Sequence, residues 1–555
     1  MVAQTPEQTV FAEDAVLEST YPRIPIPDLE TLSACEFLLN AAKENVKLGR
    51  TKWLTNTITG ETLNFSDAEP MSRSVGSAMF KRGMKKGDVC LYMTTDVTKV
   101  FVFTLGVWRC GGIMYSSYPE DTQDTILTRI EESNVKWVLC DAGSVPQVKQ
   151  AIAQVPWAVE IMVIGDVDDC TNISEIFEDD GAECPNLSEE ADLDDPLLIL
   201  CTSGTTGKSK GAVYTNLQVL AFTIGTSNIP YNEAPAILVL RCTHVLGMLF
   251  PIRNLKAGVW SVLMHDITKE NIFKAVDQYK PVLAFGFATF LVLLATDPEA
   301  KKYDRSSLEV IITGGMVLTE KFYNDMMTLP SVKCVFNGYG MTECAALTTT
   351  IDLSGLSQGY KLMPNVPALS CGKLYPNTSM KILDLDNGRG LGPKQQGEIA
   401  IASPIMCSGY WKGSAETNSL FQNGWMRTGD LGYYDENGFV YVVDRIKETF
   451  KYFNCHISPA EIEEIILHHP SVEEAVVVGV VDPDGGDRIP RAFVVLKQDS
   501  QNEAPDVIRT FVDNQVAPYK KLRGGLYVIP SLPKNKTGKI SRVDCLALDV
   551  QAPAC

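Results

Sequence analysis

Short apolar runs alternate with amphipathic stretches along most of the chain, and this alternation restricts the fold more than any other feature of the sequence. The runs end at turn-forming residues and have the length of buried strands. They cover residues 88–95, 136–143, 161–166, 196–203, 236–242, 281–287 and 308–315. The segments between them, such as 122–133 and 269–278, are amphipathic. Alternating strands and helices predict an α/β fold with doubly wound parallel sheets, covered by helices on both faces.

The pattern changes near residue 370. Residues 372–404 carry turn residues every few positions, which is typical of a small β-barrel or β-rich module. Further on, residues 459–470 predict a helix and residues 472–483 a strand. We therefore expect a large domain over residues 1–444 and a separate α+β domain over residues 445–555.

Composition narrows the class of partner. The 555 residues include 49 basic and 68 acidic side chains, a net charge of −19, so we expect no nucleic-acid partner and no anionic membrane surface. The 15 cysteines are scattered, which indicates reduced thiols, and five histidines make a histidine-rich metal site improbable. The most apolar window, residues 282–296, is shorter than the ~20 residues that span a bilayer. Without a secretory signal at the N-terminus, a soluble, intracellular protein is expected.

The segment CTSGTTGKSKG, residues 201–211, follows an apolar run and predicts a polyanion site. Its glycines and hydroxyl residues expose N–H and O–H donors, and Lys208 and Lys210 add positive charge. It is not a Walker A loop, because only two residues separate Gly204 from Gly207.

Two later segments add nucleotide chemistry. In NGYGMTEC, residues 337–344, Tyr339 offers a flat face to a base and Glu343 a hard oxygen ligand for Mg²⁺. In GWMRTGDLGYYDENG, residues 424–438, the carboxylate of Asp430 has two oxygens that could accept hydrogen bonds from both ribose hydroxyls.

Together with DRIKETFKYFNCHISPAEIEE (444–464) and PKNKTGKISR (533–542), these motifs resemble the adenylate-forming superfamily. This superfamily contains acyl-CoA synthetases, peptide-synthetase adenylation domains and beetle luciferases. The resemblance covers residues 50 to 545, and it is strongest to plant coumarate–CoA ligases and insect luciferase-like fatty acyl-CoA ligases. It implies a mobile C-terminal domain with a hinge at Lys447.

The resemblance also implies a role for each matching residue. The β- and γ-phosphates of ATP would be held by a loop that comprises Thr202, Ser203, Gly204, Thr205, Thr206, Gly207, Lys208 and Lys210. The adenine and α-phosphate would be contacted by Gly314, Gly315, Asn337, Gly338, Tyr339, Gly340 and Thr342. Asp430 would bind the ribose, Arg445 the nucleotide at the domain junction, and Glu343 the Mg²⁺.

Catalytic and acyl-pocket roles follow in the same way. Lys539 would bridge the α-phosphate and the acyl carboxylate, and Lys451 would lie on the face used in the second half-reaction. His244 would be the gate between nucleotide, acyl group and thiol. The acyl pocket would be formed by Phe222, His244, Ala346 and Leu347.

The sequence thus predicts an ATP- and Mg²⁺-dependent ligase that joins a medium- or long-chain fatty acid, or an aryl-alkenoic acid, to CoA. Two alternatives remain open: a luciferase-type monooxygenase and a non-catalytic adenylate-binding pseudoenzyme. No carrier-protein domain is recognisable in the chain. Because Pro553-Ala554-Cys555 is not a Ser-Lys-Leu-type peroxisomal signal, a cytosolic location is expected.

Departures from the family pattern affect the second half-reaction most. Asn454 stands where a glycine is usual and can narrow the thiol channel, and Asp487-Arg488 replaces a Gly-Glu pair. Ser209 replaces a proline in the phosphate loop and leaves its donors in place.

Overall fold

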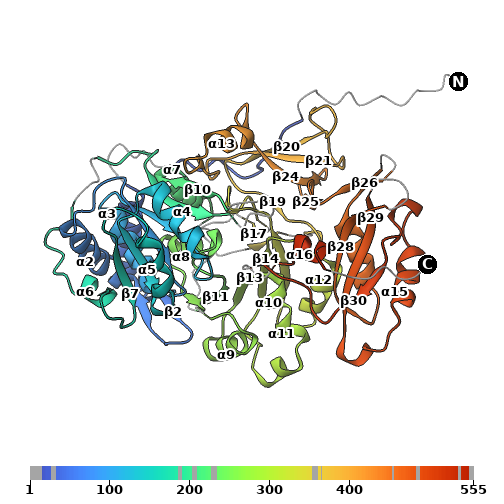
Figure 1. Ribbon diagram of the computed structural model, residues 1–555, viewed down its shortest axis with the longest axis horizontal. Helices are drawn as coiled ribbons and strands as arrows, with labels where there is room; N and C mark the ends of the chain where they lie inside the picture. The colour runs from blue at the N-terminus through green and yellow to red at the C-terminus, as the bar shows by residue number, and fades with distance from the viewer. Residues whose placement is uncertain are drawn as a thin grey trace.

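The computed structural model describes residues 15–26, 33–185, 190–202, 209–226, 234–264, 266–349, 351–352, 361–363, 366–452, 455–482, 488–535 and 539–548. Within these residues, two largely parallel sheets and an antiparallel sheet share strands from interleaved parts of the chain, and a C-terminal α+β domain follows them. Figure 1 shows the first sheet and its helices at the left, the second sheet in the centre and the C-terminal domain in red at the right.

The first sheet is parallel except at one edge. Its strands lie in the order β22 (Gly409–Tyr410), β10 (Gly211–Thr215), β9 (Pro196–Cys201), β5 (Ile113–Ser116), β4 (Val89–Met93), β6 (Trp137–Asp141), β7 (Glu160–Ile164) and β8 (Thr171–Asn172). Helices α4 (Gln123–Ser133) and α5 (Val145–Ile152) pack on one face through a core that includes Ile126, Ile130 and Val148.

The second sheet is also parallel apart from its last strand. Its order is β15 (Cys334–Gly338), β14 (Val310–Gly314), β13 (Leu283–Gly286), β11 (Ala236–Val239), β12 (Ser261–Leu263), β2 (Lys52–Asn56) and β3 (Thr62–Asn64). One face is covered by α9 (Lys269–Tyr279), α10 (Ala288–Leu291), α11 (Leu293–Thr296) and α12 (Glu320–Met327).

The largest apolar core joins the inner faces of the two sheets. It takes buried side chains from α1 (Ala34–Lys47), α2 (Ala68–Lys81), α3 (Lys99–Arg109), α7 (Asn216–Thr226) and α8 (Val245–Ala257). Helices on both faces of parallel sheets confirm the predicted α/β class. The predicted strands and helices coincide with observed elements, and residues 282–296 form β13 followed by α10 and α11.

The expected β-module is an antiparallel sheet above the two parallel ones (Figure 1). It consists of β1 (Leu17–Glu18), β20 (Ser379–Leu383), β21 (Gly397–Ala402), β24 (Trp425–Tyr434) and β23 (Phe421–Gln422), with β25 (Val440–Arg445) also paired to β24. Short pairs β16–β19 (Thr348–Thr349, Lys373–Leu374) and β17–β18 (Ile351–Asp352, Lys361–Leu362) and helix α13 (Ser414–Leu420) complete this region.

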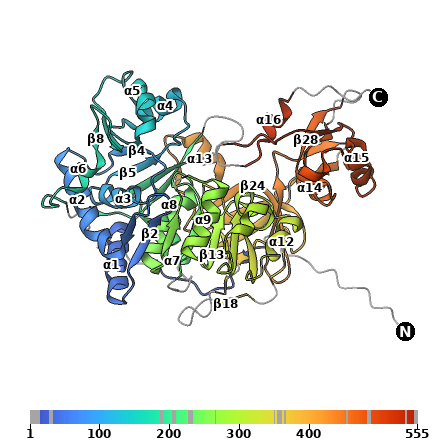
Figure 2. The ribbon, with the colours of Figure 1, turned by 90° about the horizontal axis from the view of Figure 1, so that it is seen from below.

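The C-terminal domain has its own apolar core. It contains the hairpin β26–β27 (Phe450–Tyr452, Cys455–Ile457) and the sheet β28–β29–β30 (Val472–Val481, Arg488–Leu496, Leu526–Val528). Its helices are α14 (Pro459–Leu467), α15 (Pro505–Asp513) and α16 (Arg542–Leu546). Figure 2 shows this domain at one end of the molecule, beside the large domain.

Two expectations from composition concern cysteines and membranes. The 13 cysteines whose side chains the structure describes are all free thiols. Across the described ranges, no helix combines the length and the apolar character needed to cross a bilayer.

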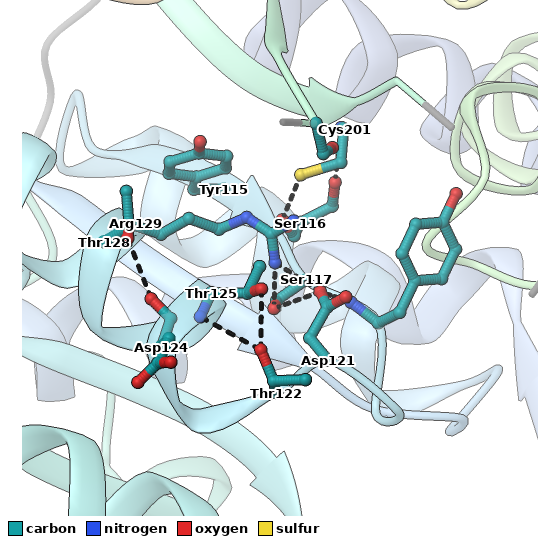
Figure 3. A network of polar contacts seen from close by, with 12 residues as sticks. Tyr115, Ser116, Ser117, Asp121, Thr122, Asp124, Thr125, Thr128, Arg129 and Cys201 are labelled. Atoms are coloured by element: carbon teal, nitrogen blue, oxygen red, sulfur yellow. Dashed lines mark hydrogen bonds and ion pairs between the residues drawn. The ribbon is translucent and has the colours of Figure 1, made fainter. Parts of the chain in front are cut away.

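A buried polar network ties the end of β5 to the end of β9, at the point where the predicted phosphate loop begins (Figure 3). Arg129 on α4 forms an ion pair with Asp121 and donates to Ser117, and Arg129 and Asp121 are both almost fully buried. The same Asp121 carboxylate accepts hydrogen bonds from Ser117 Oγ at 2.9 Å and from the Tyr118 amide at 2.8 Å. On the other strand, the Cys201 amide donates to Ser116 Oγ at 2.9 Å.

We predict that Arg129→Leu lowers the free energy of unfolding by about 3–5 kcal/mol, because it leaves the buried Asp121 carboxylate without its cation. Arg241→Leu is the matched control. Its ion pair with Glu120 is partly exposed, so its loss is worth about 0–1 kcal/mol. Thermal and denaturant unfolding of the two ligand-free variants measures the loss of stability in each. Equal losses would show that the buried network does not stabilise the junction between β5 and β9.

Candidate functional site

One cavity of about 3000 Å³ gathers residues from all the predicted motifs. It opens where the carboxyl ends of β9, β14 and β15 meet the third sheet and the C-terminal domain, which is the usual position for ligand sites in open α/β sheets. The predicted site residues in its wall are Thr202, Lys210, His244, Gly314, Gly315, Asn337, Gly338, Tyr339, Gly340, Thr342, Glu343, Ala346, Asp430, Arg445, Lys447 and Lys539.

The base of the predicted phosphate loop is closed by hydrogen bonds between its two ends. The Thr202 amide donates to the Lys210 carbonyl at 2.8 Å, and the Lys210 amide donates back to Thr202 Oγ1 at 3.1 Å. Ser209 Oγ, at the position where a proline is usual, donates to the Thr202 carbonyl at 2.7 Å. The tip of the loop, which comprises Ser203, Gly204, Thr205, Thr206, Gly207 and Lys208, lies outside the described residues.

The turn after β15 brings Tyr339 and Glu343 into the cavity wall. Gly340 is required there, because a Cβ atom at this position would lie 1.9 Å from the Ala345 carbonyl oxygen. Ala345 itself has a positive φ of 50°, which is uncommon for a residue with a side chain. The turn is held by hydrogen bonds from the Leu347 amide to the Tyr339 carbonyl at 2.8 Å and from the Tyr339 amide to Thr348 Oγ1 at 2.9 Å.

Asn337 presents a hydrogen-bond acceptor to the cavity. Its Nδ2 donates to the Met316 carbonyl at 3.4 Å, whereas its buried Oδ1 accepts no hydrogen bond from any described residue. A buried polar atom in this state is costly unless a ligand satisfies it. The exocyclic amine of adenine is a donor of the required kind.

Asp430 on β24 is buried and is the centre of a polar cluster with the buried Tyr339 and the partly exposed Arg445. Tyr339 Oη donates to Asp430 Oδ2 at 2.8 Å, and Arg445 Nε lies 3.3 Å from Asp430 Oδ1. Burial raises the pKa of Asp430, and the Arg445 guanidinium acts in the opposite direction. Each carboxylate oxygen retains a further lone pair, so the cluster can accept ribose hydroxyls.

The predicted metal ligand Glu343 is held by a residue that the sequence did not indicate. Tyr410 Oη donates to Glu343 Oε1 at 2.6 Å, and Lys210 Nζ lies 4.9 Å from the centre of the Tyr410 ring. Tyr410 thereby connects the phosphate loop to the carboxylate. Glu343 is 7% exposed and supplies the hard oxygen atoms that Mg²⁺ prefers.

Lys539 reaches into the cavity from the C-terminal domain. A Cβ atom on Gly315 would lie 2.8 Å from Lys539 Nζ, and Nζ lies 5.5 Å from the centre of the Phe287 ring. Burial lowers the pKa of Lys539 to about 8, and the positive charge of Arg445 contributes in the same direction. The ammonium group is therefore poorly solvated and repelled by a neighbouring cation, a position that an anionic ligand would stabilise.

His244 is the N-cap of α8 and lies beside the same ring. Its Nδ1 accepts a hydrogen bond from the Leu246 amide at 3.3 Å, and its ring packs edge-on against Phe287 with centroids 5.1 Å apart. Burial and the charge of Lys539 lower the pKa of His244 to about 3. The imidazole is therefore neutral near pH 7, with Nδ1 engaged at the N-terminus of α8.

Contacts between the domains fix this arrangement. Asp444 Oδ2, at the end of β25, accepts hydrogen bonds from Ser458 Oγ at 2.7 Å and from the Ala460 amide at 3.1 Å, at the start of α14. Glu464 Oε1 on α14 accepts a hydrogen bond of 2.9 Å from the amide of Glu320, the first residue of α12. Carboxylates at two helix N-termini thus hold the C-terminal domain in the position that delivers Lys539.

Two residues of the predicted acyl pocket are placed differently. Phe222 is fully buried behind Phe250, with ring centroids 5.5 Å apart, and only Phe250 reaches the cavity wall. Leu347 is likewise fully buried in the core. The prediction that these two side chains face the acyl group is therefore wrong, whereas Ala346 does line the cavity. Lys451 lies in β26, and its side chain is outside what the structure describes.

Sequence reasoning missed Tyr410, Phe287, Phe250 and Arg253, which all line the cavity. Tyr410 and Phe287 belong to no motif and are brought in only by the meeting of separate elements. The helical spacing of Leu246, Phe250 and Arg253 was a usable signal, since positions i, i+4 and i+7 share one face of a helix.

Comparison with known proteins supports the motif assignment. The family described as "AMP-binding enzyme" matches residues 45–411, and "AMP-binding enzyme C-terminal domain" matches residues 461–539. Peroxisomal OPC-8:0-CoA ligase 1 of Arabidopsis thaliana is 30% identical over 95% of this chain and 94% of its own length. 4-Coumarate–CoA ligase 2 of Petroselinum crispum is 29% identical over 96% of this chain and 97% of its own length.

Solved structures share the fold at lower identity. A benzoate CoA ligase from Burkholderia xenovorans LB400 superimposes with a TM-score of 0.79 at 21% identity, covering 93% of this chain and 99% of its own. A luciferase-like enzyme from the nonluminescent Zophobas morio mealworm gives a TM-score of 0.68 at 22% identity, covering 79% of this chain and 100% of its own. On the family match and the relatives together, the chain belongs to the AMP-binding enzymes, the adenylate-forming superfamily that its motifs resemble.

Proposed function

We propose that this protein is an acid–thiol ligase that activates a carboxylic acid with ATP and transfers the acyl group to CoA. The observation that carries the proposal is Lys539, which the C-terminal domain inserts against Gly315 in the cavity that contains Asp430, Arg445 and Glu343. The names of the ligases in Arabidopsis thaliana and Petroselinum crispum support the same reaction class.

In the first half-reaction, an oxygen of the substrate carboxylate attacks the α-phosphorus of ATP. The bond from that phosphorus to the bridging oxygen breaks, and pyrophosphate leaves with the electron pair. Both reactants are anions, so catalysis needs positive charge at the developing pentavalent phosphate. We assign this role to the Lys539 ammonium, which lies against Gly315 and whose pKa burial lowers to about 8.

The nucleotide would be held by the groups already described. Asn337 Oδ1 accepts from the adenine amine, Asp430 accepts from the ribose hydroxyls, and Thr342 lies at the α-phosphate. The Glu343 carboxylate, oriented by Tyr410, has the donor chemistry for Mg²⁺. When bound there, the ion would supply further positive charge to the phosphate oxygens.

In the second half-reaction, the thiol of CoA loses its proton to solvent, its sulfur attacks the carbonyl carbon of the acyl-adenylate, and AMP leaves with the electron pair of the broken C–O bond. Lys539 has no part in this step, because the C-terminal domain has by then turned it away from the α-phosphate. We propose that the C-terminal domain turns about Lys447 between the two steps. This rotation withdraws Lys539 from the cavity and brings the face that carries Lys451 to the acyl-adenylate.

The cavity wall indicates an elongated, mainly apolar acid. Leu246, Phe250 and Phe285 line it next to His244, and Ala346 leaves room between them. A medium- or long-chain fatty acid or an aryl-alkenoic acid fits this wall. The cytosolic location expected from the sequence remains a prediction, and the Arabidopsis thaliana relative is named as peroxisomal.

We predict that release of pyrophosphate requires a carboxylic acid, ATP and Mg²⁺ together, and that AMP release passes beyond one turnover only with CoA. The reason is that an acyl-adenylate held in a closed site blocks the enzyme until a thiol removes it. A coupled pyrophosphate assay over a broad acid panel, with and without CoA, measures both effects. Folded protein that releases no pyrophosphate with any acid would overturn the proposed function.

We predict that Lys539→Ala slows adenylation by about 10²–10³-fold, because it removes one charged contact to the transition state. The same variant should convert pre-formed acyl-adenylate and CoA to thioester at close to the wild-type rate. Lys520→Ala, which removes a lysine paired with Glu461 on the same domain, is the control and should leave both rates unchanged. Equal slowing of both half-reactions by Lys539→Ala would contradict the two-position mechanism.

We predict that kcat/KM of adenylation for ATP falls as the pH rises through about 8. Lys539 has a pKa lowered to about 8, so its cation is present below that pH and lost above it. Lys539→Arg, which stays charged, should move the fall to higher pH at the cost of a lower plateau. Pyrophosphate release at low ATP between pH 6 and 10 checks this, and superimposable profiles of the two proteins would refute it.

A further inference from the structure

Lys539 belongs to a short pair of segments, residues 533–535 and 539–541, which we call the lysine arm. The Asn535 amide donates to the Lys539 carbonyl at 2.8 Å, and the Lys539 amide donates back to Asn535 Oδ1 at 3.0 Å. The Ser541 amide donates to the Pro533 carbonyl at 2.9 Å at the base of the arm. These bonds hold the two segments together, but they do not set the orientation of the arm relative to the cavity.

Arg542 directly follows the arm, at the start of α16, and binds three groups of the C-terminal domain. Its Nη1 and Nη2 pair with the two carboxylate oxygens of Glu463 on α14, the second at 3.0 Å. Its Nε donates to Glu448 Oε2 at 2.8 Å, and its Nη1 donates to the Val477 carbonyl on β28 at 2.7 Å. The planar fork of guanidinium donors allows one side chain to hold all three partners, and we call these contacts the Arg542 clamp.

The other segment of the arm has a weaker anchor. Lys534 Nζ lies 2.6 Å from Glu474 Oε1 on β28, with side chains that are 36% and 32% exposed. The side chains of Arg542 and Glu463 are only 20% and 14% exposed. Ion pairs of exposed groups contribute little, whereas two parallel bonds between a guanidinium and a carboxylate are strong and directional. The Arg542 clamp is therefore the stronger of these two anchors.

Helix α14 connects the clamp to the large domain. Glu464, the residue after Glu463, accepts the hydrogen bond from the amide of Glu320 on α12. Two successive residues of one helix thus contact the large domain and, through Arg542, the lysine arm. Docking of α14 on α12 therefore determines where Lys539 lies in the cavity.

The three partners of Arg542 all lie on the C-terminal side of Lys447, the proposed hinge. Glu448 is the next residue after Lys447, and Glu463 and Val477 follow it in the same domain. Rotation about Lys447 therefore carries the clamp as one unit and does not need to break it. Loss of the clamp should consequently affect the step in which Lys539 acts, and not the rotation.

The titration of Lys539 reports its position. Lys539 faces two carboxylates, Asp430 and Glu448, and two basic groups, Arg445 and His244. Burial lowers the pKa of Lys539 to about 8, and Arg445 contributes in the same direction. A lysine in water has a pKa of about 10.4, so an arm that leaves the cavity would let the pKa of Lys539 rise.

We propose that Arg542 is a positioning residue for adenylation, which holds the lysine arm against α14 so that the docked domain places the Lys539 ammonium at the α-phosphate. The proposal rests on the ligase function proposed above and adds a residue that acts through Lys539. Two other roles are possible for such an arginine: it could only stabilise the domain, or it could contact the nucleotide itself. The experiments below distinguish the three.

The first experiment compares the two half-reactions. Arg542→Met removes the clamp, and we expect it to lower kcat of adenylation by about 10–100-fold, because a misplaced catalytic group loses most of its effect. KM for ATP should stay within about threefold of wild type, since the lost interaction belongs to the transition state. Conversion of pre-formed acyl-adenylate and CoA to thioester should stay close to the wild-type rate. Equal slowing of both half-reactions would show a general structural role and overturn the proposal.

Two further variants accompany this comparison. Arg509→Met removes an arginine paired with Asp513 on α15 of the same domain, and should change neither half-reaction. Arg542→Lys keeps a charge but lacks the fork that holds three partners, so it should restore part of the adenylation rate. It also serves if Arg542→Met does not fold. An Arg542→Lys variant that slows thioester formation as much as adenylation would likewise overturn the proposal.

The second experiment asks whether Arg542 acts through Lys539. In the Lys539→Ala background, Arg542→Met should have no further effect on adenylation, because residues that act as a unit give non-additive losses. An additional loss of about 10-fold or more, as independent contributions would give, would show that Arg542 acts on the nucleotide by itself and would overturn the proposal.

The third experiment needs no catalysis and so separates this inference from the proposed function. Acetic anhydride labels deprotonated amines, and mass spectrometry of the ligand-free proteins between pH 6 and 11 gives the titration midpoint of Lys539. We expect a midpoint near 8 in the wild type and in Arg509→Met, and a midpoint raised by about one unit or more in Arg542→Met. This result would support the positioning role even if no acid gave pyrophosphate. Equal midpoints in the wild type and Arg542→Met would refute that role, whatever the enzyme catalyses.

Discussion

The placement of two partly buried cations, Lys539 and Arg445, near the buried Asp430 carboxylate is the constraint on which the rest of the structure depends. The protein carries a net charge of −19, so a polyanionic nucleotide meets an unfavourable overall field. Local cations in a poorly solvated cavity overcome that field, because Coulomb interactions are stronger where water is excluded. Keeping them there requires contributions from both domains.

This requirement explains the interface between the domains. Arg445 stands at the end of β25, whereas Lys539 comes from a loop nearly one hundred residues later, and like charges repel. Asp444 and Glu464 hold the domains together at two helix N-termini and so offset the repulsion. Both contacts are polar, which suits the rotation of the domain that we propose between the two half-reactions.

The sequence by itself determined the α/β class, the strands of both sheets and the nucleotide motifs, because strand burial and loop chemistry are encoded within short segments. It did not decide which side chains face the acyl group. Helix α7 is apolar on nearly every side, so nothing in its sequence shows that Phe222 points into the core, and Leu347 is hidden by the turn at Ala345. Only the tertiary structure decided the positions of Tyr410 and Phe287 and the contact of Lys539 with Gly315. Each of these contacts joins segments that lie far apart in the chain, and such packing leaves no local pattern in the sequence.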